Sequence, residues 1–247
     1  MTAYTSAISV LATLGLRLIL MNTFYKSPMQ FKWAWRQIYG FLTLWNFAYA
    51  FILGILIFFV VPIEAIEDRW EIMLINVAPL VLFGQVGAIG NLYYQLKQRP
   101  LEIGVRTGVF GIIGVLLNLY FISYLEMGYM GWFWSSFITT TLSNASYWYP
   151  INFKIGMKPI FNFKWRLIKN SLNVSFPTIP HYYSTFLINS SDRVVMDLLK
   201  IRTDDIGKYN AAYTVGNIVQ QLGMAAGQAV GPMLMQEYRK GNDKGAR

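Results

Sequence analysis

The chain alternates long apolar stretches with short polar ones, and this pattern predicts a bundle of membrane-spanning helices. A span needs about 20 mostly apolar residues, and seven stretches of suitable length follow one another along the chain. They cover residues 4–23, 36–62, 72–96, 104–125, 129–150, 172–201 and 207–235. The expected fold class is therefore all-α, a polytopic transmembrane helix bundle of about seven spans, in which the last two are the most polar.

Four of these stretches carry polar side chains at helical spacing, so each of these helices has one polar face. The four faces consist of Ser6, Ser9, Thr13 and Arg17; Ser136, Thr139, Thr140, Ser143 and Asn144; Thr178, Tyr182, Thr185, Asn189 and Asp192; and Asn210, Thr214, Asn217, Gln221 and Gln228. Lipid cannot satisfy such groups, so they face protein or water. Hydrogen bonds between packed helices explain isolated Ser and Thr, but faces that end in Arg17 or Asp192 favour a hydrated cavity.

Charged residues within the spans are the main candidates for function. An arginine in mid-span, such as Arg17, is costly unless it is paired or hydrated. One possibility is that Arg17 faces the cavity, where the several N–H donors of its planar guanidinium suit a phosphate. The other is that its side chain extends to the nearer membrane interface. Asp192 and Arg193 are neighbours in the sequence, so we expect them to point to different faces of their helix and to have separate partners.

Glycine and proline add expectations about packing. Glycines recur every three residues in the third and fourth stretches, which predicts close helix contacts there. These glycines are Gly84, Gly87 and Gly90, and Gly108, Gly111 and Gly114. Pro177 and Pro180 are expected to kink the start of the sixth span.

The composition agrees with a membrane protein and excludes several kinds of site. Apolar residues make up 55% of the chain and charged residues only 13%, about half the usual quarter, and the mean hydropathy is +0.37. There is no cysteine and a single histidine, His181. Disulfides, thiol catalysis and metal sites built from histidine clusters are therefore excluded. We expect no catalytic residue, no bound metal and no cofactor.

The net charge is +9, which by itself could indicate a nucleic-acid partner. The distribution of the basic residues along the chain indicates a lipid bilayer instead. Fifteen of the 21 Lys and Arg residues fall in alternate loops, and only four fall in the opposite set. Because cytoplasmic loops are the basic ones, residue 1 is placed outside and residue 247 inside. An odd number of spans that starts outside predicts that an upstream helix is missing.

The longest basic loop marks a boundary between two parts of the chain. Phe161, Trp165, Ile168 and Leu172 share one helical face, which predicts an interfacial amphipathic helix. The expected organisation is five spans in residues 1–151, a cytoplasmic amphipathic connector in 152–171, and two spans with a basic tail in 172–247.

The stretch from Ser175 to Gly231 resembles the polysaccharide-export branch of the multidrug/oligosaccharidyl-lipid/polysaccharide flippase superfamily, which includes Wzx-type O-antigen flippases. In that family a helix with prolines at its start and a mid-helix Asp-Arg is followed by a short turn and a G-x-Y-x-x-A-Y motif. The matching residues here are Pro177, Pro180, Asp192, Arg193, Gly207, Tyr209, Ala212 and Tyr213. Phe24–Lys26 similarly resembles the end of the family's second helix.

The resemblance implies a partial two-lobe flippase fold that holds the family's second to eighth helices. Such a protein turns a polyprenyl-diphosphate-linked oligosaccharide across the inner membrane for surface polysaccharide biosynthesis. The implied substrate contacts are Arg17, Arg193, Asn189, Asn217 and Gln221. Asp192 is the implied site of a coupling cation or proton.

Three other interpretations remain open from the sequence. A multidrug exporter of the same superfamily favours an acidic cavity, whereas two intramembrane arginines against one aspartate favour an anionic cargo. A membrane enzyme needs a base or nucleophile near an acid, and His181 has no evident partner in sequence, so we expect no enzymatic activity. The third alternative is a non-transporting membrane fragment.

Overall fold

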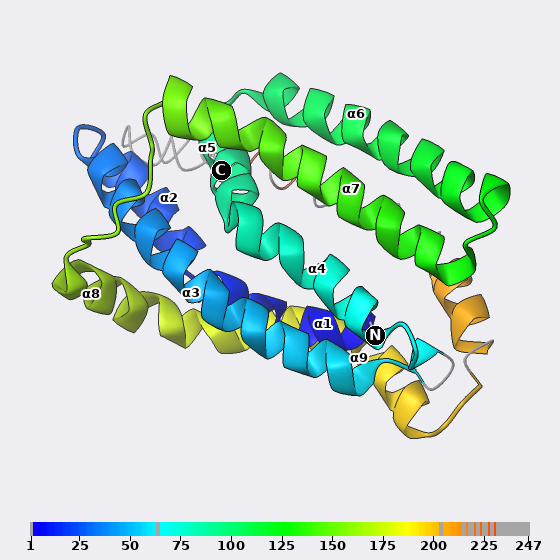
Figure 1. Ribbon diagram of the computed structural model, residues 1–247. Helices are drawn as coiled ribbons and strands as arrows, with labels where there is room; N and C mark the ends of the chain where they lie inside the picture. The colour runs from blue at the N-terminus through cyan, green and yellow to red at the C-terminus, as the bar shows by residue number, and fades with distance from the viewer. Residues whose placement is uncertain are drawn as a thin grey trace.

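The computed structural model describes residues 2–62, 65–202 and 205–213, together with the single positions 216, 220, 223, 227 and 230. In this described part the regular secondary structure is entirely helical, which confirms the all-α prediction. Figure 1 shows that most helices run along one long direction of the molecule, so that loops form its two ends.

The first predicted span is broken into two helices. α1 covers Thr2–Ser9 and continues as a 3₁₀ turn, Val10–Ala12, while α2 covers Arg17–Lys26. Between them Leu14 and Gly15 both have positive φ, 49° and 70°. The hydroxyl of Ser175 donates a 2.9 Å hydrogen bond to the Leu14 carbonyl. The prediction of one continuous helix is wrong here, because a side chain from residue 175 satisfies backbone that the break exposes.

A second break divides the third predicted span. α3 is an unbroken helix, Phe31–Val60, but the next stretch forms α4, Arg69–Phe83, and α5, Val86–Leu96, which are bent by 55°. Gly84 ends α4 with φ +56° and ψ −134°, a backbone conformation that glycine adopts far more readily than other residues. We predicted that Gly84 would allow two helices to pack closely, but in the structure it forms the bend between α4 and α5.

The next two helices form an antiparallel pair. α6 covers Pro100–Asn118 and is extended by a π-helical segment, Leu119–Tyr124, and α7 covers Gly128–Tyr149 before a second π-helical segment, Pro150–Lys154. A Cβ on Gly87, Gly90 or Gly114 would meet side chains of α7, so the packing prediction is confirmed there. Gly108 and Gly111 have nothing near them in the described residues, so it is wrong for these two.

The connector lies against α3 before the last long helices begin. The Ile160 amide donates to the Arg36 carbonyl at 3.0 Å, and the Lys164 amide donates to Gln37 Oε1 at 2.7 Å. A Cβ on Gly40 would lie 1.9 Å from the Ile160 carbonyl oxygen. Residues 155–164 are therefore held on α3 at a position where α3 has no side chain.

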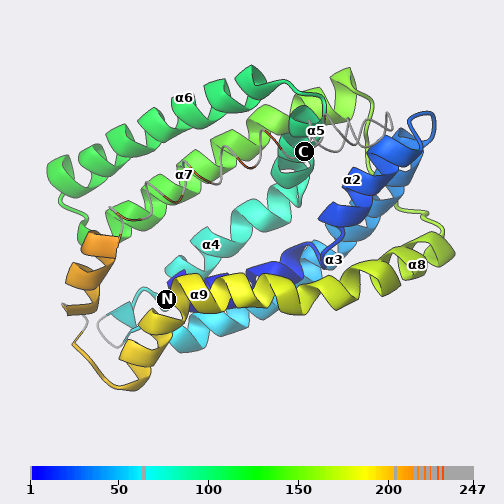
Figure 2. The ribbon, with the colours of Figure 1, turned by 180° about the vertical axis from the view of Figure 1, so that it is seen from behind.

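The amphipathic helix that we predicted after this segment packs on protein. α8 covers Trp165–Ser175 and is followed by a 3₁₀ turn, Phe176–Thr178, and by α9, Ile179–Leu198. Ile168 is fully buried, and α8 contacts α2 and α3. Figures 1 and 2 show α8 continuing along the direction of α9, which contacts α1.

Two helices in the described part are long and apolar enough to cross a membrane alone, α3 and the continuous segment Pro100–Tyr124. The bent pair α4–α5 makes a third if it counts as one span. The seventh predicted span, residues 207–235, lies mostly outside the described residues. Among the other six, the count is lower than predicted for two physical reasons. The break between α1 and α2 leaves helices of 8 and 10 residues, and α7 and α9 carry the polar faces that lower their hydropathy.

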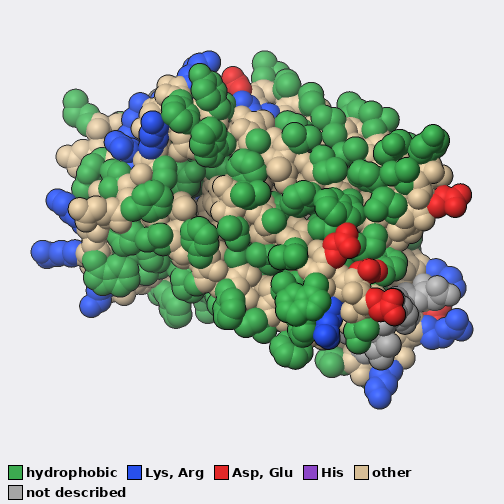
Figure 3. Space-filling model, viewed as in Figure 1, with side chains coloured by type: hydrophobic (Ala, Val, Ile, Leu, Met, Phe, Trp, Pro, Cys, Tyr) green, Lys and Arg blue, Asp and Glu red, His purple; other side chains and the backbone are tan. Residues whose placement is uncertain are grey.

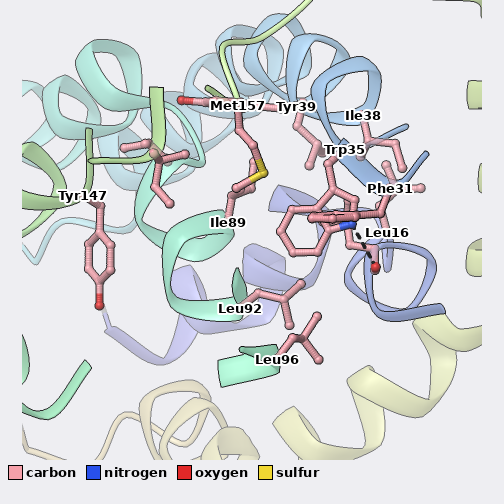
Figure 4. Close-up of a cluster of buried hydrophobic side chains, with 14 of the residues drawn as sticks. Leu16, Phe31, Trp35, Ile38, Tyr39, Ile89, Leu92, Leu96, Tyr147 and Met157 are labelled. Carbon is pink, nitrogen blue, oxygen red and sulfur yellow. Dashed lines mark hydrogen bonds between the residues drawn. The ribbon is translucent and has the colours of Figure 1, made fainter. Parts of the chain in front are cut away.

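The main hydrophobic core lies between α2, α3, α5 and α8. Figure 4 shows Trp35 among Leu16, Phe31 and Ile38, and its indole nitrogen donates a 3.0 Å hydrogen bond to the Leu20 carbonyl. Edge-on contacts between Trp35, Phe31 and Phe24 extend this core toward the loop after α2. This core fixes α2 in place on the far side of its break from α1.

The surface is apolar along the helices and charged at the ends (Figure 3). α6 has no buried residue, and its Leu101 side chain is 79% exposed. Lys and Arg side chains gather around α2 and α8, at what we call the basic end of the molecule. The opposite end, which we call the acidic end, carries several acidic side chains together with some Lys and Arg side chains. Such a surface is suited to lipid along its length and to water at both ends.

Candidate functional site

A cavity of about 360 Å³ lies between α1, α3, α4 and α7. Two other hollows, one beside α6 and one between α3 and α4, have larger volumes of about 460 and 440 Å³. We call the cavity between α1, α3, α4 and α7 the large cavity, to distinguish it from the small cavity around Arg17. In the polar lining of the large cavity, Ser9 belongs to the face predicted for the first span, and three residues of α7 belong to the face predicted for the fifth span. Thr5 on α1 and Asn76 on α4 were not predicted. The polar side chains of the lining are Thr5, Ser9, Asn76, Ser136, Thr140 and Asn144. The two polar faces therefore meet in space although they are more than 100 residues apart in sequence.

The remainder of the lining is aromatic or aliphatic. Tyr49 projects from α3, and Trp132, Phe133 and Phe137 come from α7. No charged side chain among the described residues lines this cavity. Its surface is therefore neutral, with hydrogen-bonding groups set beside aromatic rings, and it differs from the cationic cavity that the family resemblance implies.

The small cavity, of about 40 Å³, lies closer to the basic end and includes Arg17 in its lining. Arg17 is the first residue of α2 after the break, and its Nη2 donates a 2.8 Å hydrogen bond to Gln95 Oε1 on α5. Of the two placements predicted for Arg17, the structure gives the one inside the bundle. Thr13, from the same predicted polar face, lines this cavity as well.

A buried pair of amides lies between the two cavities. Asn46 on α3 is 1% exposed, and its Nδ2 donates to the Leu80 carbonyl at 2.5 Å. Gln85, at the break between α4 and α5, donates to Asn46 Oδ1 at 3.0 Å. Along α3, Leu42 lines the small cavity and Tyr49 the large one, so Asn46 occupies the level between them. We call Asn46 and Gln85 the amide pair.

Neither amide was among the residues singled out from the sequence. Each is a lone amide within an apolar run, so no periodic face draws attention to it. The sequence does indicate that each amide has a hydrogen-bond partner, because burying an amide in an apolar run without one is energetically costly. It does not indicate which residue that partner is.

Asp192 and Arg193 form an ion pair with each other, which the prediction of separate partners did not include, although each also has a partner of its own. Asp192 Oδ1 accepts hydrogen bonds from the Arg193 backbone amide at 2.9 Å and from its Nη1 at 3.4 Å. Asp192 Oδ2 accepts a hydrogen bond from the hydroxyl of Tyr209. The long arginine side chain folds back along the helix, which brings its charge to the neighbouring carboxylate.

The same arginine connects α9 to the helix that follows. Arg193 Nε donates to Asn210 Oδ1, and the guanidinium lies 4.2 Å from the centre of the Tyr213 ring. Neither Asp192 nor Arg193 lines the large or the small cavity. The side chain of Asn189, and all of Asn217 and Gln221, lie outside the described residues, so their predicted roles remain predictions.

Replacing Arg193 by alanine is expected to lower the stability of the α9 junction by about 1.5 kcal/mol, the loss that follows removal of a charge-assisted hydrogen bond. Thermal unfolding in detergent measures this change. The control is Lys208→Ala, because the Lys208–Asp205 pair is exposed and such pairs contribute little. Equal melting temperatures for the two variants would contradict the structural role of Arg193.

At the acidic end, side chains connect α4 to α7 above the large cavity. The Tyr129 hydroxyl donates to Asp68, and Trp134 Nε1 donates to Glu71 Oε1 at 2.8 Å. Trp132 and Phe133, which lie between these two donors in sequence, line the cavity. The cavity is therefore bordered at this end by contacts that hold the two helices together.

Within the residues that the structure describes, no group of three or more His, Cys, Asp or Glu side chains is placed to hold a metal ion. Comparisons of the chain with models of protein families, with curated proteins and with solved structures give no match. The candidate site therefore rests on the two cavities, the amide pair and the two helix breaks.

Proposed function

We propose that this protein is a flippase, or part of one, that moves a polyprenyl-diphosphate-linked oligosaccharide across the inner membrane for surface polysaccharide biosynthesis. The observation that carries the proposal is the meeting of two broken helices at a polar interior, inside a bundle whose outer surface suits lipid. Transporters use discontinuous helices of this kind to place polar groups at membrane depth.

Arg17 is the proposed contact for the diphosphate. It lies at the N-terminal end of α2, where the helix dipole adds positive potential, and Gln95 fixes the direction of its guanidinium. A planar guanidinium can donate two parallel hydrogen bonds to phosphate oxygens. Because the helix is broken before α2, the Arg17 guanidinium faces a cavity and not the lipid.

The proposed topology is the seven-pass arrangement, with the basic end in the cytoplasm. Residues 1–151 belong to the first lobe, 152–171 form the connector, and 172–247 begin the second lobe. Fifteen of the 21 Lys and Arg residues fall in the loops assigned to the cytoplasmic side, which supports this orientation. In this scheme Arg17 contacts the cargo from the first lobe, and Asp192, in the second lobe, remains the proposed site for a coupling cation or proton.

Replacing Arg17 by alanine in the complete gene product is expected to reduce surface-polysaccharide complementation about tenfold or more, in a strain that lacks its own oligosaccharide flippase. The reason is the loss of charge-assisted hydrogen bonds to the cargo, which are worth about 1.5–3 kcal/mol. Surface polysaccharide is measured by gel and normalised to the amount of protein in the membrane. Arg17→Lys should retain part of the function, because the charge remains but the fork geometry is lost.

Arg166→Ala is the control, because Arg166 lies on the exposed side of α8. It should leave complementation unchanged. Full complementation by Arg17→Ala at normal protein levels would remove Arg17 from the cargo contacts. Efflux of ethidium by the wild-type protein, without polysaccharide export, would instead favour the multidrug exporter.

A further inference from the structure

The large cavity has a chemistry that the diphosphate contact leaves unexplained. Its polar lining consists of amides and hydroxyls from three helices, and each such group can pair with a ligand hydroxyl. Amides offer both donors and acceptors, and hydroxyls act as either. A ligand with many neighbouring hydroxyl groups is the natural match for this lining.

The absence of charge on the cavity surface restricts the ligand further. A charged group moved into this space would lose its hydration and gain no counter-charge, at a cost of several kcal/mol. A diphosphate is therefore disfavoured here, and so is a cationic drug, which needs a carboxylate. The ligand must be polar but uncharged.

The aromatic rings and the volume complete the description. Tyr49, Trp132 and Phe137 offer flat faces beside the polar groups, and such faces carry a negative potential that attracts the C–H edges of a ring-shaped ligand. A volume of about 360 Å³ falls in the range of small-molecule sites, roughly 300–1,000 Å³. Sugar rings combine hydroxyl edges with apolar C–H faces.

We infer that the large cavity is a binding site for uncharged sugar residues, and that it receives the oligosaccharide portion of the cargo. This inference rests on the proposed function for its identification of the cargo. It assigns the two ends of the head group to different places, the diphosphate to Arg17 and the sugars to the lining formed by Asn76, Thr140 and Asn144. The amide pair separates the two places in this conformation.

The lack of cysteine in the chain provides a direct test. Thr140→Cys introduces one thiol into the large cavity, and its rate of labelling by a maleimide is measured in the purified, complete protein. The probes are a panel of neutral tri- to pentasaccharides of hexoses and N-acetylhexosamines, and inorganic pyrophosphate. A bound saccharide should slow labelling about sixfold at five times its Kd, by mass action, whereas pyrophosphate should not.

Ser146→Cys is the matched control, because Ser146 lies on the same helix but lines a different hollow, beside α6. Saccharide should leave its labelling rate unchanged. The inference is overturned if no saccharide protects residue 140, if protection is equal at residues 140 and 146, or if pyrophosphate protects residue 140 equally. A second cavity variant, Ser136→Cys, should repeat the result for Thr140→Cys, and its failure to do so also overturns the inference.

A separate assay keeps this inference distinguishable from the proposed function. Flipping of a fluorescent polyprenyl-diphosphate oligosaccharide is measured in proteoliposomes with the wild-type protein. Flipping without saccharide protection would overturn the sugar site alone. Saccharide protection without flipping would overturn the proposed transport and leave a sugar-binding membrane protein.

Discussion

Replacing Gly40 by alanine is expected to destabilise the protein by about 3 kcal/mol or more, at the upper end of the cost of overpacking. The new Cβ would lie 1.9 Å from the Ile160 carbonyl oxygen, which is backbone and cannot rotate away. The connector would have to leave α3, with loss of the Ile160–Arg36 and Lys164–Gln37 hydrogen bonds. Thermal unfolding in detergent and protease cleavage within residues 155–164 measure both effects.

Gly104→Ala is the matched control for Gly40, since it makes the same change in a helix where the added methyl meets nothing. It should be neutral or stabilise α6 by up to about 1 kcal/mol, the difference in helix propensity between glycine and alanine. If the two variants melt at the same temperature and the connector remains protected, the close contact between α3 and residue 160 is refuted.

Replacing Asn46 by leucine is expected to give the second largest effect, a loss of about 1–3 kcal/mol for each buried polar group left without its partner. Gln85 would lose its hydrogen bond to Asn46 Oδ1, whereas the Leu80 carbonyl would lose the bond from Nδ2 but keep the 2.8 Å bond from the Gly84 amide. Because Gln85 lies at the bend between α4 and α5 and Leu80 lies in the last turn of α4 before it, the level between the two cavities should loosen. The melting temperature should fall, and labelling of a thiol at residue 140 should become faster.

Asn118→Leu provides the comparison for Asn46→Leu. Asn118 also sits in an apolar helix, but its side-chain oxygen is buried without a hydrogen-bond partner among the described residues. Its replacement should therefore be neutral or stabilising, because an unsatisfied polar atom is removed. A stability loss for Asn118→Leu equal to that for Asn46→Leu would show that the amide pair has no special role.

The sequence alone determined the helical class, the polar faces of the first and fifth predicted spans, and the concentration of Lys and Arg in alternate loops. These features depend on the period and composition of single segments, which each segment carries by itself. Ser9, Thr140 and Asn144 were identified in this way, and they lie on one cavity. The position of Arg17 inside the bundle was one of two alternatives that the sequence left open.

The tertiary structure decided where the helices break and which groups meet. The apolar runs are continuous through Gly15 and Gly84, so periodicity predicts unbroken helices at both places. The breaks hold because groups distant in sequence satisfy the backbone there, Ser175 at Leu14 and Asn46 at Leu80.

The same physical reason explains the docking of the connector on α3 at Gly40. A sequence pattern gives the cost of leaving a polar group without a partner, or of adding a side chain at a crowded position. The identity of the partner depends on contacts between residues tens of positions apart, as for Asn46 and Gln85 or Arg17 and Gln95. Such contacts exist only once the helices are packed together.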